Sequence, residues 1–468
     1  MSRLHLALCA VALTVMVGSM YAAPKGGISE SLIQELMSTK MSGTDKLLAD
    51  IVANKSVTDV ALNRDELIAH SKIFNFKIKT GDITNQKISG RCWMFAGFNV
   101  LRPQVMKKYK LKGFEFSQNY MMFWDKLEKS NFFLQEMIDM AGRPIDDREL
   151  MIIMQDPFGD GGWWTYFADL AGKYGVVPKE AMPETYNSST SGTMNNLIGL
   201  KLKEMGIGLR AMVLAGKPQP EIEQAKTEML GQIYHWLVMN LGQPPQDFTW
   251  RYETTDSSSI VTYPKKLTPV EFYKDVIGVD LNDYVAMFNV PNKDMFNTYS
   301  LKFSRDMYDR PDFVIVNVPS DTLRAYAVKS ILDSTPVWFA ADIGQENYGA
   351  DGILKRGIYD YAAMYGTTFE MPKGDMIQAQ LITANHAMTF LGVDTLGGQV
   401  QKWLVENSWG SDRGDKGMWT MYNDWFDRYV FGMVIHKKYL SDDLVKLSKK
   451  EPTVLPSWDP MYCLNRLN

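Results

Sequence analysis

The order of the hydrophobic patterns constrains the fold of this chain most, since helical patterns come first and strand patterns fill the last third. Apolar residues follow helical spacing through residues 117–140 and again through Trp164, Phe167 and Leu170. Four later segments are rich in β-branched and aromatic residues and predict strands: residues 312–318, 336–341, 386–393 and 402–407. This segregation predicts an α+β fold, with a cleft possible where the two halves meet.

Breaks in these patterns divide the 468 residues into five predicted parts. Between the polar stretch that begins at Asn187 and the pair Pro244–Pro245, apolar residues recur in steps of three and four, which indicates an inserted helical module. Shorter helical patterns occur at Ser29–Met37 and Asp65–His70. The predicted parts are a signal peptide (1–22), an N-terminal segment with the helical half (23–186), the inserted helical module (187–270), the β-rich half (271–440) and a C-terminal tail (441–468).

The first residues have the features of a secretion signal. Arg3 precedes a mostly apolar run, Leu4–Val17, and small residues follow, so cleavage is expected after Ala22. The run is shorter than the roughly 20 residues that span a bilayer, and bulky Leu8 before Cys9 disfavours lipidation. No later segment is apolar enough over a sufficient length to cross a membrane. We therefore expect an exported protein, periplasmic or secreted.

Few residues are available for disulfide or metal chemistry. Of the three cysteines, Cys92 and Cys463 remain after cleavage, which favours a thiol kept for its reactivity; one disulfide between them is the alternative. Four histidines remain and none is spaced as a ligand pair, so we predict no metal site and no cofactor. The net charge of -4, without a long Lys/Arg run, disfavours a nucleic-acid partner.

Cys92 is the predicted nucleophile, because the sequence places it at the start of a helix. A loop with Gly90 and Arg91 precedes it, and apolar residues suited to a buried helix follow it. Pro103 should kink or end this helix, since its ring removes a hydrogen bond. Free amides at a helix N-terminus favour a thiolate. A buried structural cysteine is the alternative interpretation.

A predicted hairpin identifies the base and the residue that orients it. Gly397–Gly398 is typical of a two-residue turn, so residues whose numbers sum to about 795 should face each other. His386 then lies opposite Trp409, with Asn407 diagonal to it on the same face, at roughly 7 Å. A turn centred one residue earlier sets Asn407 directly opposite His386, and a bulge would alter either register. The alternative roles are a core histidine and a capping asparagine.

These residues together can perform peptide hydrolysis. Cys92 attacks the peptide carbonyl, His386 transfers the proton to the leaving amine, and Asn407 holds the imidazole in the useful tautomer. Gln86 can point its amide at the developing oxyanion beside the Cys92 N–H, an effect worth roughly 3 kcal/mol. The alternative for Gln86 is a solvated loop side chain.

Three blocks around these residues resemble the active-site blocks of the papain superfamily and, within it, the bleomycin hydrolase and aminopeptidase C family. The blocks are Gln86 with Ser89–Ala96, then Asn385–Met388, then Val405–Gly410. The similarity extends over about residues 60–461. It implies a papain-like cysteine peptidase fold with a helical insertion, peptide substrates cleaved at free N-termini, and a homohexamer that encloses the active sites. It also implies that Trp93, Asn385 and Trp409 contact substrate.

The chain departs from this family at both ends. The best-known members are cytosolic, whereas an export signal is expected here. In the family, the C-terminal carboxylate lies in the cleft and holds the amino group of the substrate. Here the tail after Trp458–Met461 is longer than usual by Arg466, Leu467 and Asn468. We therefore expect trimming to Leu464 or Asn465, which would complete the substrate-binding set.

The resemblance favours a cysteine aminopeptidase, and two alternatives stay open. A papain-like endopeptidase or carboxypeptidase would use the same four polar residues. An inactive shell that binds peptides without cutting them is a further alternative, against which the complete set of Gln86, Cys92, His386 and Asn407 argues.

Overall fold

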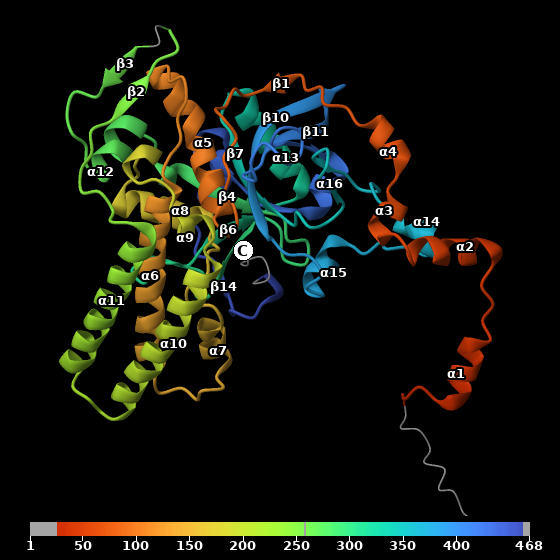
Figure 1. Ribbon diagram of the computed structural model, residues 1–468, viewed down its shortest axis with the longest axis horizontal. Helices are drawn as coiled ribbons and strands as arrows, with labels where there is room; N and C mark the ends of the chain where they lie inside the picture. Colours follow the sequence, from red (N-terminus) through yellow and green to blue (C-terminus); the bar gives the residue numbers. More distant parts are fainter. Residues whose placement is uncertain (1–25, 257–258, 462–468) are drawn as a thin grey trace, which may run out of the picture. The chain divides into compact units, whose positions relative to one another are not determined.

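The computed structural model describes residues 26–256 and 259–461 (Figure 1). The predicted signal peptide lies outside the described residues. The chain divides into two compact units, Met1–Ala61 and Leu62–Asn468. The described helices of the first unit are α1 (Glu30–Met37), α2 (Gly43–Val52) and α3 (Val57–Ala61). Ser29 and Ser42 cap α1 and α2 through their side chains, and neither helix buries a residue.

Helices dominate the first part of the second unit, as the sequence predicts. They are α4 (Arg64–Ala69), α5 (Cys92–Tyr109), α6 (Gln118–Asp139), α7 (Arg148–Gln155), α8 (Trp164–Tyr174), η1 (Lys179–Ala181), α9 (Tyr186–Ser189), α10 (Gly192–Leu214), α11 (Gln219–Leu241), α12 (Pro269–Glu271), η2 (Phe272–Ile277) and η3 (Leu281–Asp283). The long helices α10 and α11 pack against α6 and against each other (Figure 1). They form the main part of the predicted helical module.

The segment predicted as a helical module also contains strands. Arg251–Glu253 (β2) and Ile260–Thr262 (β3) form a separate antiparallel pair. Ile260, Val261 and Thr262 are β-branched, which suits an extended backbone. The helical pattern of the module therefore ends at Leu241, where α11 ends.

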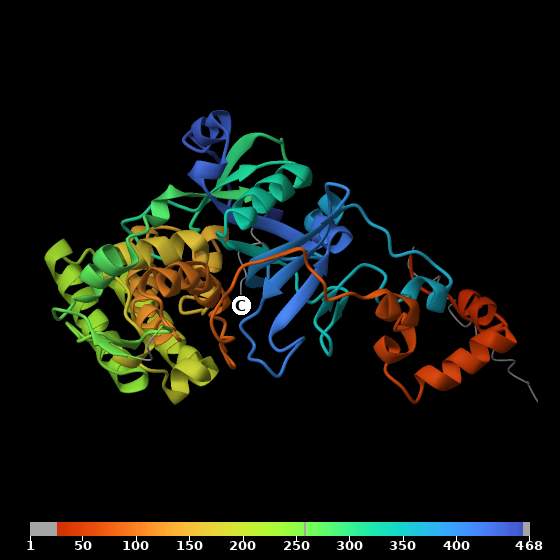
Figure 2. The ribbon, with the colours of Figure 1, turned by 90° about the horizontal axis from the view of Figure 1, so that it is seen from above.

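The described strands of the C-terminal half form one mixed sheet of twelve strands, ordered β14-β5-β6-β4-β13-β7-β10-β11-β12-β9-β8, with β1 beside β10. The strands are β1 (Phe76–Lys77), β4 (Tyr284–Phe288), β5 (Asn297–Leu301), β6 (Val314–Asn317), β7 (Val337–Ala341), β8 (Asn347–Tyr348), β9 (Ile353–Leu354), β10 (His386–Leu396), β11 (Gln399–Glu406), β12 (Met418–Tyr422), β13 (Val430–His436) and β14 (Thr453–Leu455). The helices among them are α13 (Ser320–Leu332), α14 (Tyr361–Tyr365), α15 (Lys373–Gln378), α16 (Asn423–Tyr429), η4 (Lys437–Tyr439) and α17 (Asp442–Leu447). Figure 2 shows helices α6–α11, coloured from orange through yellow to green, on one side of this sheet. The predicted α+β architecture is confirmed.

The β10–β11 hairpin has the predicted turn, because Gly397 and Gly398 both adopt positive φ. The pair Leu396↔Gln399 sums to 795, as expected, and so does Thr389↔Glu406 at the far end of the ladder. Between these ends the register changes twice: Gln401 is an extra residue on β11, and Leu391 is an extra residue on β10. The two irregularities cancel, which preserves the predicted register at Thr389↔Glu406, the last pair of the ladder before His386 and Asn407.

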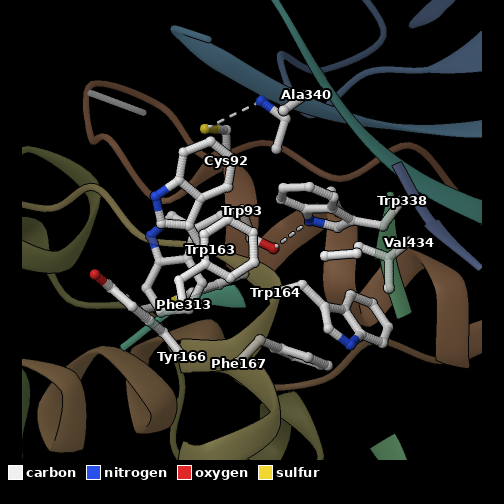
Figure 3. Close-up of a cluster of buried hydrophobic side chains, with 14 of the residues drawn as sticks. Cys92, Trp93, Trp163, Trp164, Tyr166, Phe167, Phe313, Trp338, Ala340 and Val434 are labelled. Atoms are coloured by element: carbon white, nitrogen blue, oxygen red, sulfur yellow. Dashed lines mark hydrogen bonds between the residues drawn. The ribbon is translucent and has the colours of Figure 1, made fainter. Parts of the chain in front are cut away.

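Helix α5 lies between the helical half and the sheet. Figure 3 shows Cys92 and Trp93 above a cluster of aromatic side chains from both halves, where the Trp338 indole donates a 3.2 Å hydrogen bond to the Trp93 carbonyl. Pro103 was predicted to kink or end this helix, and the second alternative is wrong, because α5 continues to Tyr109. Packing of its buried residues against both halves outweighs the hydrogen bond that proline removes. No described helix is long and apolar enough to span a bilayer.

Candidate active site

Cys92 is the first residue of α5, and Arg91 at the N-cap position makes no side-chain capping bond to it. The Cys92 Sγ accepts a hydrogen bond from the backbone N–H of Ala387, at 3.5 Å. Ala387 follows His386 at the start of β10, so the nucleophile helix and the histidine strand meet at the sulfur atom. Burial raises the pKa of the Cys92 thiol to about 11, whereas the N–H groups of Ala387, Trp93 and Cys92 favour the thiolate.

His386 and Asn407 form the predicted pair. The His386 Nε2 lies 2.8 Å from the Asn407 Oδ1, which also accepts a 2.8 Å hydrogen bond from the Ser408 N–H. Since this oxygen can only accept, Nε2 carries the proton, and Nδ1 of the neutral ring is the proton acceptor. Burial lowers the pKa of His386 to about 4, against the effect of the Asn407 hydrogen bond.

Trp409 covers the His386 ring. The centroids of the two rings are 4.7 Å apart and their planes differ by 30°. Both His386 and Asn407 are buried, with exposed fractions of 3% and 0%. Exclusion of water strengthens the hydrogen bond between them and keeps the ring in one orientation.

Gln86 connects the loop before Cys92 with the segment after Asn407. Its Nε2 donates to the Ser89 carbonyl at 2.6 Å, and its Oε1 accepts from the Ser408 hydroxyl at 2.7 Å. The side chain is 6% exposed, so the interpretation as a solvated loop glutamine is wrong. An amide nitrogen has two N–H groups, of which Ser89 occupies one. Its oxyanion role stays a prediction.

Asp160 is a further site residue that the sequence did not identify. Its carboxylate accepts hydrogen bonds from the Gly90 N–H at 2.9 Å and from the Ser191 hydroxyl at 2.5 Å, and lies 2.7 Å from the Lys126 Nζ. Burial opposes ionisation, but Lys126 and these hydrogen bonds hold the pKa of Asp160 below its usual range. Asp160 thereby fixes the loop before Cys92 to the helical half. The only sequence signal was its position among glycines, which was interpreted as a break between helices.

A buried ion pair joins α5 to the strand that ends beside Asn407. The Arg102 Nη2 lies 2.5 Å from the Glu406 Oε1, and the side chains are 2% and 0% exposed. Thr80 donates to the other Glu406 oxygen at 3.1 Å, and Arg102 also donates to the Asp82 carbonyl at 2.6 Å. This Arg102–Glu406 clamp fixes three segments together: the one before Gln86, the Cys92 helix and the Asn407 strand.

The residues expected to contact substrate lie in different surroundings. The Trp93 indole is fully buried and donates a 2.8 Å hydrogen bond to the Asp160 carbonyl, so its side chain packs in the core and the expectation of a substrate contact is corrected. Asn385 donates to Asp342 at 2.7 Å and accepts from the Ile343 N–H, which fixes the loop after β7. Trp409 is half-buried. Leu464 and Asn465 lie outside the described residues.

The arrangement suits transfer of an acyl group to a thiol. It places a thiol at a helix N-terminus, in contact with the backbone N–H of the residue that follows a histidine, and an asparagine fixes the tautomer of that histidine. Within residues 26–256 and 259–461, no group of three or more His, Cys, Asp or Glu residues could hold a metal ion.

Known proteins are similar to this chain in sequence and in fold. The model of the Peptidase C1-like family matches residues 27–462. Aminopeptidase C of Lactobacillus delbrueckii subsp. lactis is 37% identical over 84% of this chain and 88% of its own length. Bleomycin hydrolase of Mus musculus is 33% identical over 94% and 99%. The crystal structure of PepW from Lactobacillus rhamnosis HN001 superposes with a TM-score of 0.91 at 36% identity, covering 94% of this chain and 99% of PepW. This chain therefore belongs to the Peptidase C1-like family of cysteine peptidases.

Proposed function

We propose that this cysteine peptidase is an aminopeptidase that removes residues from the free N-termini of peptides, using Cys92, His386 and Asn407. The observation that carries the proposal is the Cys92 sulfur held by the Ala387 N–H, directly after the histidine of the His386–Asn407 pair. The names of the relatives, aminopeptidase C, E and G, support the choice of aminopeptidase over endopeptidase or carboxypeptidase.

The mechanism follows from the chemistry of the groups. The Cys92 Sγ attacks the carbonyl carbon of the peptide bond while its proton moves to the His386 Nδ1. His386 then gives this proton to the leaving amine, and a thioester with Cys92 remains. Water attacks the thioester with His386 as the base, which releases the acid and regenerates the thiol. The Cys92 N–H and the Gln86 amide stabilise the oxyanion of each step.

The C-terminal tail is the proposed element that selects free N-termini. Its described part is anchored: Asp459 forms a 2.9 Å ion pair with Lys293, Arg148 lies over the Trp458 ring at 4.7 Å, and Met461 is buried. We expect the enzyme to trim the residues beyond Leu464 or Asn465. The new carboxylate would pair with the amino group of the substrate.

Paired substrates with free and blocked N-termini test the proposal. We expect alanine 4-nitroanilide to be cleaved and its N-acetyl form to resist cleavage, and Cys92→Ala to lose the activity. The matched control is Cys463→Ala, which should keep full activity. Preferential cleavage of the blocked substrate would favour an endopeptidase, and absence of any Cys92-dependent cleavage would favour a peptide-binding shell.

Export and assembly are further parts of the proposal. Export rests on the signal sequence, and mass spectrometry should find a mature chain that begins at Ala23. Assembly into a homohexamer rests on the family resemblance and on apolar side chains exposed in the first unit: Leu32, Ile33, Leu36, Met37, Leu47 and Ile51. Sedimentation should give six chains for the wild type and fewer for Leu36→Gln/Met37→Gln. A monomeric wild type would contradict this.

A further inference from the structure

A cavity of about 270 Å³ lies beside the ring that covers His386. Its lining residues are Gly344, Asn347, Gly349, Trp409, Arg413 and Trp419. Trp409 separates this cavity from His386: its ring lies over the imidazole, and the edge of Trp419 meets it at 5.6 Å between centroids. The proposed mechanism does not use this cavity.

Polar groups around the cavity lack partners within the described part of the chain. The exposed Arg413 guanidinium forms no ion pair or hydrogen bond there, unlike most arginines of the molecule. The Trp419 Nε1 and the Asn347 Oδ1 are both buried without a hydrogen-bond partner. A buried polar group without a partner costs roughly 1–3 kcal/mol, which a bound ligand or water can offset.

The turn that carries Arg413 is fixed in place. The Gly414 N–H donates to the Gly349 carbonyl at 3.2 Å, and the Gly417 N–H donates to the Arg413 carbonyl at 2.8 Å. Gly414 has a φ of +59°, and a Cβ added there would lie 2.9 Å from the Trp419 Nε1. Glycine thus permits both the turn and the close approach to the indole. Arg413 is therefore presented at the cavity by a tight, hydrogen-bonded turn.

The chemistry of peptide cleavage says which part of a substrate comes here. His386 gives its proton to the leaving amine, so the residue on the carboxyl side of the cut bond must lie against His386. Because Trp409 lies over the His386 ring and also lines the cavity, the next atoms of this residue can extend past Trp409 to the cavity. In a dipeptide these atoms end in an α-carboxylate, the group that a guanidinium binds best.

We propose that this cavity binds the leaving residue of the substrate and that Arg413 pairs with its free α-carboxylate. The proposal rests on the proposed function and narrows its substrate class to dipeptides. The Trp419 Nε1–H and the side-chain Oδ1 of Asn347 are the further donor and acceptor at the cavity wall for the bound residue. Arg413 acts on specificity and takes no part in the chemical steps.

Kinetics with three substrates test the proposal: alanyl-leucine, alanyl-leucinamide and alanine 4-nitroanilide. The wild type should prefer alanyl-leucine over its amide by about tenfold in kcat/KM, since only the acid offers a carboxylate. Arg413→Gln should abolish this preference, Arg413→Lys should retain part of it, and all variants should cleave the anilide equally. Arg251→Gln removes another exposed arginine, on β2, and should change nothing.

Two results separate the failure of this site from the failure of the proposed function. The carboxylate site alone is overturned if the enzyme cleaves the anilide through Cys92 but does not prefer alanyl-leucine over alanyl-leucinamide. The same conclusion follows if this preference survives Arg413→Gln. Absence of Cys92-dependent cleavage of all three substrates overturns the aminopeptidase proposal and, with it, this site.

Discussion

Burial acts on both reacting groups of the site in the direction that keeps each neutral. It raises the pKa of Cys92 to about 11 and lowers the pKa of His386 to about 4. An ion on either residue alone is costly in this setting, whereas transfer of one proton from sulfur to nitrogen creates two opposite charges that stabilise each other. The reactive form is therefore the pair with a single proton, and the protein holds this form over a wide pH range.

We predict that the rate of Cys92 alkylation by iodoacetamide, which has no titrating group, rises with pH in two widely separated limbs, because each step yields a form of the pair whose sulfur can react as the thiolate. A lowered His386 pKa means that the second proton leaves at lower pH, so the acid limb should lie below 6.5, the ordinary imidazole value. A raised Cys92 pKa should place the alkaline limb, where the pair loses its last proton and the thiolate remains, above 9.0, the ordinary thiol value. The rate of alkylation measured from pH 3 to 12 checks both limbs. An acid limb above 6.5 would refute the effect of burial on His386.

Removal of the reacting groups should affect turnover far more than stability. We predict that Cys92→Ala lowers kcat by at least about 10³-fold with little change in melting temperature, because the nucleophile is lost and little volume changes. His386→Ala should be as severe, and Asn407→Ala should cost less because it orients the ring. Turnover of purified variants on alanine 4-nitroanilide checks this order. Wild-type turnover by Cys92→Ala would eliminate the mechanism.

Individual residues differed in how far the sequence could predict them. The glycine pair set the hairpin register at the turn, and this rule relates His386 to Asn407 correctly because the two later irregularities cancel. Asp160 was missed because its partners Gly90, Lys126 and Ser191 come from three separate segments. Trp93 was assigned to the substrate through the family resemblance, whereas its indole is fully buried in the core.

At the scale of elements, the site depends on how α5 is held against the hairpin. The Arg102–Glu406 clamp is the buried ionic contact between the two, one residue from Asn407. The sequence predicted both elements, but it could not predict their contact, because Arg102 and Glu406 are separated by about 300 residues. The two compensating irregularities of the β10–β11 hairpin could likewise not be predicted from the sequence, since each depends on packing against neighbouring strands.

We predict that Arg102→Met lowers the free energy of unfolding by about 3–5 kcal/mol, because it leaves the Glu406 charge buried without its partner. The same variant should lower kcat more than it raises KM, since the clamp orients catalytic segments and contacts no substrate. Urea unfolding and kinetics on the anilide measure the two effects. The double variant Arg102→Met/Glu406→Leu should recover part of the stability.

The matched control for this prediction is an exposed ion pair of similar geometry. Lys112 and Glu253 are 2.9 Å apart, with side chains 60% and 42% exposed. Lys112→Met should leave the urea midpoint almost unchanged, since solvent screens such a pair. Equal losses of unfolding free energy in Lys112→Met and Arg102→Met would show that burial of the Arg102–Glu406 clamp is not the cause of the destabilisation.

At the scale of the whole molecule, the halves of the second unit have separate tasks. The helical half supplies Cys92 and its anchors, whereas the sheet supplies His386 and Asn407. The segregation of patterns in the sequence was enough to predict this division, because helices and strands leave different periodicities. Assembly and the position of the C-terminal tail depend on surfaces that meet only after folding. From the sequence, they are therefore predicted through the family resemblance alone.

The tail provides the test at this scale. Truncation after Met461 leaves the buried Met461 and the Lys293–Asp459 ion pair intact, so the fold should survive. If a trimmed carboxylate holds the amino group of the substrate, truncation should lower kcat/KM for free-amine substrates by about tenfold or more, equivalent to about 1.4 kcal/mol. N-blocked peptides should become better substrates, because the end of the cleft is open.

Intact mass should show that the wild type loses C-terminal residues that Cys92→Ala keeps. If both proteins keep Asn468 and truncation leaves the preference unchanged, the tail does not select free N-termini, and an endopeptidase becomes the better description.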